Sequence, residues 1–163
     1  MRSSPFLIAR LLREVDFARA RTIVQLGVGT GCITRAVLRD LHPDARLLSI
    51  ELNEEFVDEC REIADDRLTL RQGCASELPA MLAAAGIGEI DYVVSSLPLA
   101  IMDQDLVEQI LAVSEEHLAP DGMFLQYQYS LRQRAALQRR FREVYVGFAF
   151  ANIPPAYVYE CSR

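Results

Sequence analysis

The sequence predicts an α/β fold: a mostly parallel sheet of seven strands, an antiparallel C-terminal hairpin, and helices on both faces. Three observations lead to it. Short β-branched or leucine-rich segments alternate with segments of helical periodicity, this alternation stops near the end of the chain, and a glycine-rich segment joins the first strand to the helix after it. Strand–helix alternation produces right-handed βαβ units, whose parallel sheet is covered on both faces.

Seven segments have the composition of strands. They are residues 22–26, 46–50, 68–71, 92–95, 123–127, 143–150 and 157–161. Between the first five of these segments lie stretches in which apolar residues recur at helical spacing. Val37, Leu38 and Leu41, for example, share one face of a predicted helix. Residues 131–141 predict another helix.

The last two strands are predicted to pair antiparallel. Residues 152–155 (Asn-Ile-Pro-Pro) connect them, and prolines cannot donate to a sheet ladder. Such a connection is too short for a parallel crossover. We find no internal repeat, linker or low-complexity tract, so we expect residues 1–163 to form one domain.

Residues 1–20 are expected to form a separate helical element. Ser3 or Ser4 can cap a helix with Pro5 in its first turn. The apolar face that follows comprises Phe6, Ile8, Leu11, Leu12 and Val15. Two interpretations stay open: a helix packed over the mouth of a ligand pocket, or a basic amphipathic segment (residues 2–17) that contacts the inner face of a membrane peripherally.

Composition excludes several classes of function. No apolar run approaches the roughly 18 residues of a membrane span, and no signal-peptide pattern precedes the first strand, so we expect a cytoplasmic protein. The four cysteines form no Cys-x-x-Cys pair and the two histidines are isolated, which predicts neither a disulfide framework nor a metal site. The net charge of −6 argues against nucleic acid as a partner.

The most informative segment is residues 24–32, Val-Gln-Leu-Gly-Val-Gly-Thr-Gly-Cys. It follows a strand and opens a helix, whose free N–H groups favour an anionic ligand group. Glycines at alternate positions allow a tight turn against which a ligand can lie. The dinucleotide fingerprint would need its third glycine where Cys32 stands, so the spacing argues against a nicotinamide enzyme.

The spacing of Gly27, Gly29 and Gly31 resembles motif I of the class I S-adenosylmethionine-dependent methyltransferases, whose fold is a Rossmann-like seven-stranded sheet. Glu51 supports this resemblance, because an acid at the end of the second strand can accept hydrogen bonds from ribose hydroxyls. The resemblance implies S-adenosylmethionine as cofactor, S-adenosylhomocysteine as product, and no metal. The implied cofactor contacts are Gln25, Gly27, Gly29, Thr30, Gly31, Glu51, Leu52, Cys74, Ala75 and Ser96.

The end of the fourth strand is expected to face the methyl acceptor. Adenine N6-methyltransferases carry an Asn or Asp here, and an aromatic residue three positions later that stacks on the base. In this sequence Ser96 and Leu99 stand at those two positions, which argues against a nucleobase substrate.

Three segments resemble the bacterial phospholipid N-methyltransferases. They are Ser-Leu-Pro-Leu at 96–99, Gln-Tyr-Ser at 128–130 and Asn-Ile-Pro-Pro-Ala at 152–156. This resemblance implies methylation of the amine of phosphatidylethanolamine. We hypothesise that the loop and two tyrosines orient the amine. The candidate catalytic residues are Ser96, Leu97, Pro98 and Tyr129, and the candidate substrate contacts are Leu99, Tyr127 and Tyr129. The alternatives are an rRNA adenine dimethyltransferase-like enzyme, a small-molecule or protein methyltransferase, and a cofactor-binding module without catalysis.

Overall fold

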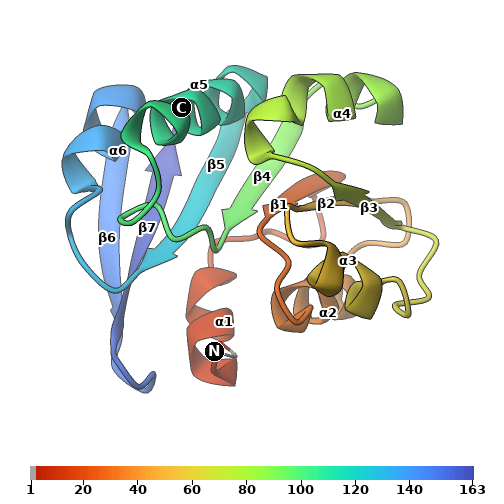
Figure 1. Cartoon of the computed structure of the whole chain (residues 1–163), viewed down its shortest axis with the longest axis horizontal. Coiled ribbons are helices and arrows are strands. Elements are labelled where there is room, and N and C mark those ends of the chain that lie inside the picture. Colours follow the sequence, from red (N-terminus) through yellow and green to blue (C-terminus); the bar gives the residue numbers. More distant parts are fainter. Residues whose placement is uncertain (1–2) are drawn as a thin grey trace.

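The computed structural model describes residues 3–163 and contains one seven-stranded sheet, in the order β3-β2-β1-β4-β5-β7-β6 (Figure 1). The strands are β1 (Thr22–Leu26), β2 (Arg46–Glu51), β3 (Leu68–Gln72), β4 (Ile90–Ser95), β5 (Leu118–Gln128), β6 (Glu143–Ala149) and β7 (Ala156–Ser162). The helices are α1 (Pro5–Leu11), α2 (Cys32–Asp40), α3 (Glu54–Cys60), the 3₁₀ turn η1 (Ala75–Glu77), α4 (Leu78–Ala85), α5 (Gln104–His117) and α6 (Arg134–Arg140).

The pairing of the strands confirms the predicted sheet. Strand β1 pairs in parallel with β2 and β4, β2 with β3, and β4 with β5. Strand β7 is antiparallel to both β5 and β6. The carboxyl ends of β1, β2, β4 and β5 therefore share one edge of the sheet with the β6–β7 connection, and we call it the carboxyl edge.

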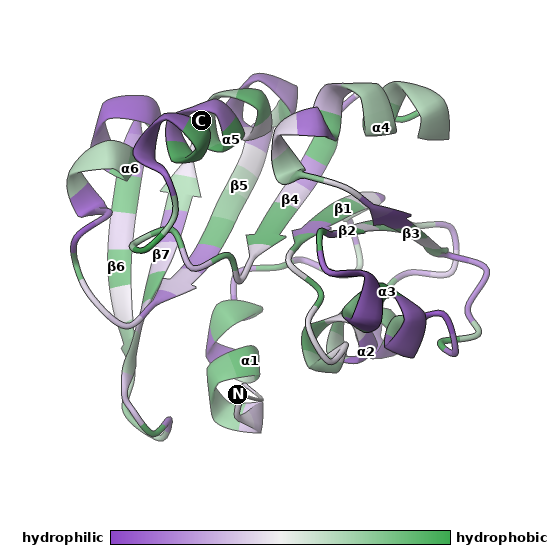
Figure 2. Ribbon diagram, viewed as in Figure 1, coloured by the Kyte–Doolittle hydropathy of each residue, from purple (hydrophilic) through white to green (hydrophobic). Residues whose placement is uncertain are grey.

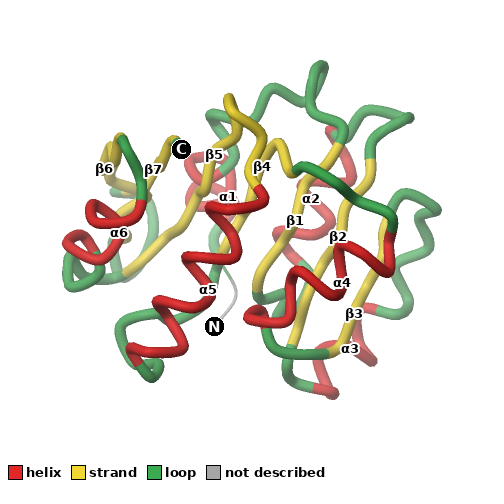
Figure 3. The backbone as a smooth tube through the Cα atoms, turned by 90° about the horizontal axis from the view of Figure 1, so that it is seen from above, coloured by secondary structure: helices red, strands yellow, loops and turns green. Residues whose placement is uncertain are grey.

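Two layers of helices cover the sheet, with α4, α5 and α6 on one face and α1, α2 and α3 on the other (Figures 1 and 3). Successive residues of β5 show how the strand serves both layers. Phe124 is buried on the α5 side, where its ring stacks on that of Phe141 at a centroid distance of 5.3 Å. Leu125 is buried on the opposite side with Leu7 and Leu11 of α1. This period of two is the reason that both faces hold an apolar core.

Several elements differ from the sequence-based prediction. Strand β5 begins five residues earlier than the pattern indicates, at Leu118, and α6 covers only Arg134–Arg140 of the predicted 131–141. Helix α4 was not identified, because its sequence Leu-Pro-Ala-Met-Leu-Ala-Ala-Ala is apolar nearly throughout and has no one-sided pattern.

Helix α1 is shorter than the predicted element of residues 1–20, and it packs on β5, β6 and β7. Ser4 is its N-cap, and the hydroxyl accepts a hydrogen bond from the backbone N–H of Leu7 (3.1 Å). Arg10 forms an ion pair with Glu160 of β7, and both side chains are mostly buried. Residues 1 and 2, which include the start of the predicted membrane segment 2–17, lie outside the described residues. Within 3–163, no helix is both long and apolar enough to cross a bilayer.

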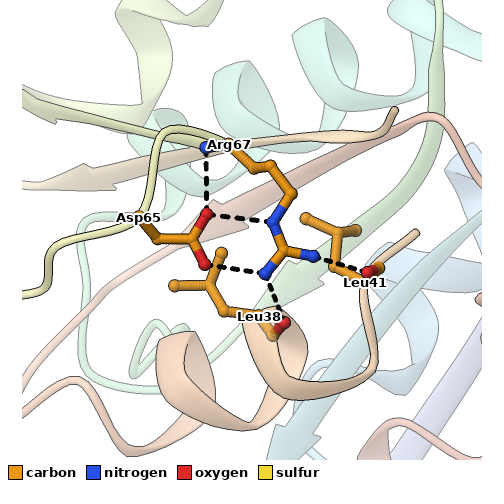
Figure 4. Close-up of polar contacts among 4 residues, drawn as sticks. All are labelled: Leu38, Leu41, Asp65 and Arg67. Atoms are coloured by element: carbon orange, nitrogen blue, oxygen red, sulfur yellow. Dashed lines mark hydrogen bonds and ion pairs between the residues drawn. The ribbon is translucent and has the colours of Figure 1, made fainter. Parts of the chain in front are cut away.

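An ion pair in the segment just before β3 connects that segment to the end of α2 (Figure 4). Arg67 donates to both carboxylate oxygens of Asp65, at 2.9 and 2.7 Å, and also to the backbone carbonyls of Leu38 and Leu41. These carbonyls belong to the last turn and C-cap of α2, which lack partners inside the helix. The Arg67 guanidinium holds the pKa of Asp65 below its ordinary value through these hydrogen bonds.

Candidate cofactor and acceptor site

The loop between β1 and α2 presents bare backbone at the carboxyl edge. Its glycines Gly27, Gly29 and Gly31 all have positive φ angles, of 80°, 54° and 78°, which residues with a side chain rarely adopt. A Cβ atom added to Gly29 would have no neighbour within 4 Å, so this glycine faces open space. Gly31 caps α2 without a side-chain hydrogen bond, which leaves the first N–H groups of that helix available to a ligand.

Glu51 holds this loop from the neighbouring strand. One carboxylate oxygen accepts hydrogen bonds from the backbone N–H groups of Val28 (2.8 Å) and Gly29 (3.0 Å), and the other accepts one from Asn53 (2.9 Å). A carboxylate has about four acceptor positions, and three are used here, so one lone pair remains for a ribose hydroxyl. Glu51 therefore fits the predicted ribose-binding role and also shapes the loop.

Gln25 lies beneath the glycine loop and is fully buried. Its amide oxygen accepts hydrogen bonds from the hydroxyls of Thr34 (2.7 Å) and Ser49 (3.0 Å), while its amide nitrogen donates to the carbonyl of Gly27 (3.3 Å). The side chain does not line the cavity above the loop. Its geometry suits support of the loop from below, rather than the direct cofactor contact that the sequence suggested.

Two adjoining cavities open beside the loop, and both are lined by Gly27, Glu51 and Leu97. The smaller, of about 80 Å³, is mostly apolar. Its remaining lining residues are Ile50, Leu52, Gly73, Cys74, Ala75, Met102, Leu106 and Ile110. The larger, of about 640 Å³, extends toward the end of β5. Its remaining lining residues are Gly29, Thr30, Phe56, Ser96, Pro98, Ala100, Ile101, Tyr127, Gln128, Tyr129 and Ser130.

These cavities fit S-adenosylmethionine. The small apolar pocket suits the adenine ring, and Leu52, Cys74 and Ala75, three of the expected cofactor contacts, line it. Glu51 lines both cavities, and Gly29 and Thr30 border the larger one. When bound, the cofactor supplies an activated methyl group on a sulfonium. Among residues 3–163 no cluster of His, Cys, Asp or Glu side chains could hold a metal ion.

The acceptor loop, residues 96–99, packs directly on the cofactor loop. The hydroxyl of Ser96 donates a hydrogen bond to the carbonyl of Gly27 (2.9 Å). A Cβ atom on Gly27 would lie 2.9 Å from that hydroxyl oxygen and 3.2 Å from a methyl group of Leu97. The close approach of the two loops therefore requires glycine at position 27.

Tyr127 and Tyr129 lie together in the cavity wall, with their rings edge to face at 5.9 Å. The Tyr127 hydroxyl lies 3.2 Å from that of Ser3, which brings the start of α1 to the site. Burial raises the pKa of Tyr127, and the hydrogen bond with Ser3 offsets this only in part. Tyr127 is therefore protonated at neutral pH, and its hydroxyl can form hydrogen bonds in the cavity wall.

Leu99 does not reach the cavity. It is fully buried in the core beneath α5, and the wall is formed instead by the next two residues, Ala100 and Ile101. Sequence reasoning also missed Phe56, Gln128 and Ser130. For Gln128 a signal existed: Gln126 and Gln128 alternate with Tyr127 and Tyr129 at the end of β5, so the side of the chain opposite the tyrosines is also polar there.

Comparisons with known proteins agree with this geometry. The family described as "Methyltransferase domain" matches residues 23–122. An ornithine lipid N-methyltransferase of Singulisphaera acidiphila is 33% identical over 162 residues, which are 98% of this chain and 84% of that protein. The ribosomal RNA small subunit methyltransferase A of Caulobacter vibrioides is 30% identical over 79% of this chain, which spans only 47% of that enzyme.

Among solved structures, precorrin-6y C5,15-methyltransferase from Geobacter metallireducens has the same fold, with a TM-score of 0.74. At 16% identity, the two structures overlap over 96% of this chain and 87% of that one. The matched family spans both the glycine loop and the acceptor loop, and the relatives extend the match to nearly the whole chain. The chain belongs to the methyltransferase-domain family and is an S-adenosylmethionine-dependent methyltransferase.

Proposed function

We propose that this enzyme methylates the amine nitrogen of a membrane lipid head group. The candidate acceptors are phosphatidylethanolamine, which the sequence resemblance implied, and an ornithine lipid, on which the relative from Singulisphaera acidiphila acts by its name. Both present an amine to the site while their acyl chains stay in the bilayer.

The observation that carries this proposal is the distribution of exposed apolar side chains. Eight large apolar or aromatic residues are exposed in the described part of the chain. All except Tyr145 lie in the loop after the carboxyl end of a strand, in the connection between β6 and β7, or at the start of α1. The seven that share this edge, which we call the rim, are Phe6, Leu52, Ile101, Tyr129, Leu131, Phe150 and Ile153. Ile101 and Tyr129 also line the larger cavity, so the rim is continuous with the site.

Exposed apolar residues scattered singly over a surface are normal, whereas a concentration of them at one edge marks an interaction site. The rim therefore favours contact with a bilayer surface. The start of α1 and the tip of the β6–β7 hairpin project to the same side of the molecule (Figure 1). Figure 2 shows that α1 is mostly apolar, whereas α3 is strongly polar. We therefore propose peripheral membrane contact through the rim on the α1 and hairpin side, away from the acidic α3.

A second candidate acceptor is adenine in ribosomal RNA, which the 30% identical relative from Caulobacter vibrioides favours. Two features argue against it. Leu99 is buried where adenine N6-methyltransferases place a stacking aromatic residue, and the net charge of −6 opposes a phosphate backbone.

The test uses methyl-labelled S-adenosylmethionine with vesicles that contain phosphatidylethanolamine or an ornithine lipid, in the presence of total RNA. The organic and aqueous phases are counted separately. We expect label in the organic phase, and chromatography of that phase identifies which lipid is methylated. Label in the RNA alone, or in neither phase, would refute the lipid proposal.

A pair of rim variants tests the membrane contact. The double variant Phe150→Ser and Ile153→Ser removes two exposed rim side chains outside the cavity. We expect slower methylation of vesicle lipid and an unchanged rate on a short-chain, monomeric lipid of the same head group. Tyr145→Ser is the matched control, because Tyr145 is the exposed side chain that lies outside the rim.

A further inference from the structure

Two glutamines of β5 donate hydrogen bonds to one carbonyl of the acceptor loop. The side-chain amide nitrogens of Gln126 and Gln128 donate to the backbone oxygen of Leu97, at 2.9 and 2.8 Å. A third glutamine, Gln133, donates in the same way to the oxygen of Leu99 (2.9 Å). Because residues 96–99 have no regular secondary structure, these amides hold the loop against the end of β5.

These two hydrogen bonds determine the orientation of the side-chain amides of Gln126 and Gln128. A carbonyl oxygen can only accept, so the NH₂ group of each glutamine must face Leu97 and the amide oxygen must face away. Gln126 also donates to the carbonyl of Tyr127 (2.8 Å), and its own oxygen is sealed in the protein interior without a partner.

The oxygen of Gln128 is in a different position. Gln128 is 5% exposed and lines the larger cavity beside Ser96. Among residues 3–163 no donor reaches its amide oxygen, and unlike the oxygen of Gln126 this oxygen is not fully buried. It therefore opens on the cavity, held in orientation by the bond from its own amide nitrogen to Leu97.

The neighbouring oxygen atoms that could also accept a hydrogen bond from an amine already have hydrogen-bond partners. The Leu97 oxygen uses its two lone pairs for the two glutamines. The Ser96 hydroxyl gives its proton to Gly27. Gln128 thus supplies a preoriented, uncharged acceptor in the cavity wall, and an acceptor of this kind suits the N–H of an amine.

We propose that the side-chain oxygen of Gln128 accepts a hydrogen bond from an N–H of the acceptor amine and so directs the nitrogen lone pair at the methyl group. This assignment rests on the proposed function. In the transfer, the nitrogen lone pair forms the new N–C bond and the C–S bond breaks, with its electron pair passing to sulfur. The methylated nitrogen then releases a proton to water when it carries one.

The proposal predicts a dependence on the degree of methylation. A neutral primary amine has two N–H groups and a secondary amine has one, whereas a neutral tertiary amine has none to donate. The bond to Gln128 therefore assists the first and second transfers and cannot assist the third. A residue that only supports the loop would affect all three transfers alike.

The experiment compares Gln128→Met with the wild-type enzyme on vesicles of otherwise identical lipids that carry a primary, secondary or tertiary amine. We expect the variant to lose about tenfold more rate on the primary amine than on the tertiary amine, because both amines share any effect of the lost bond to Leu97 and only the primary amine loses a hydrogen bond to Gln128. Its affinity for S-adenosylhomocysteine, measured by calorimetry, should equal that of the wild type.

Gln133→Met is the matched control, because it removes an amide donor to the same loop from a residue that does not line the cavity. It should slow all amines that the wild type accepts by a similar factor. An equal loss on every amine for Gln128→Met, or no loss, would overturn the assignment while the proposed function stands. A wild-type enzyme that methylates no lipid amine would overturn the proposed function, and this assignment with it.

Discussion

Glu51, at the end of β2, accepts a hydrogen bond of 3.0 Å from the backbone N–H of Gly29, 22 residues earlier in the chain. The same carboxylate oxygen is bound by the N–H of Val28. One side chain therefore sets the shape of the cofactor loop and has one acceptor position left for a ligand in the cavity. This double role makes Glu51 the first residue to test.

Replacing Glu51 with Gln removes the charge but keeps the size of the side chain. We expect affinity for S-adenosylmethionine to fall about tenfold to hundredfold, because hydrogen bonds to a charged group contribute about 1.5–3 kcal/mol. Titration calorimetry measures this. Glu54→Gln, in the exposed first turn of α3, serves as the control and should bind normally. Equal affinities of the two variants would remove Glu51 from the cofactor site.

Gly29→Ala and Gly86→Ala form a matched pair. Both glycines have positive φ angles, 54° and 66°, and at both an added Cβ would lie in open space. Each substitution should therefore lower the free energy of unfolding by about 1 kcal/mol through backbone strain alone. Only Gly29 borders the cavity, so only Gly29→Ala should also weaken cofactor binding. Urea denaturation and calorimetry separate the two effects, and normal binding by Gly29→Ala would contradict the placement of the cofactor.

Alkylation of cysteines tests the small pocket. Cys60 and Cys161 are buried, and burial raises the pKa of both thiols, so neither should react in the native protein. Cys32 and Cys74 are partly exposed, and only Cys74 lines the small pocket. Saturating S-adenosylhomocysteine should slow the alkylation of Cys74 and leave Cys32 unaffected, as read by mass spectrometry of the peptides. Equal rates at Cys74 with and without ligand would place the adenine elsewhere.

Tyr129→Phe removes a hydroxyl from the wall of the larger cavity. We expect kcat for methyl transfer to fall about tenfold, the effect of one lost hydrogen bond to the reacting amine, with no change in cofactor affinity. Tyr145→Phe, on the edge strand β6 and away from the cavity, should be as active as the wild type. Unchanged turnover of Tyr129→Phe would exclude the Tyr129 hydroxyl from the reaction.

The Asp65–Arg67 pair predicts a pH-dependent contribution to stability. The pKa of Asp65 is lowered in the folded state, so the pair stabilises the protein fully above the ordinary pKa of the carboxyl, about 3.9, and this contribution is lost as the pH falls through the folded-state pKa. Arg67→Met should cost about 1–3 kcal/mol at neutral pH, and the difference from wild type should shrink in acid. Denaturant unfolding at several pH values measures both quantities.

Arg61→Met is the control for that pair, because Arg61 meets Asp58 across an exposed helix surface. Exposed pairs of this kind contribute only about 0.2–1 kcal/mol. If Arg67→Met lowers the free energy of unfolding no more than Arg61→Met does, the Asp65–Arg67 ion pair does not stabilise the fold.

Local patterns in the sequence were sufficient for the strands of the sheet and for the glycine loop with Glu51. Strand and helix periods identified all seven strands, and the glycine spacing with Glu51 identified the loop that the structure places at the carboxyl edge. These features depend on a few neighbouring residues and on backbone angles that glycine alone adopts easily, so they can be recognised without a structure. Helix α4 escaped because its nearly uniform apolar sequence has no period.

The acceptor half of the site and the role of Gln25 depend on the tertiary structure. The turn after β4 buries Leu99 and exposes Ile101, although both are apolar and lie two residues apart. Gln25 looked like a cofactor contact, but the hydroxyls of Thr34 and Ser49 occupy its oxygen. Gln128 reaches the cavity because its amide meets the carbonyl of Leu97, 31 residues earlier. Such contacts join residues that are distant in sequence and depend on which way a loop turns, and no local periodicity encodes that choice.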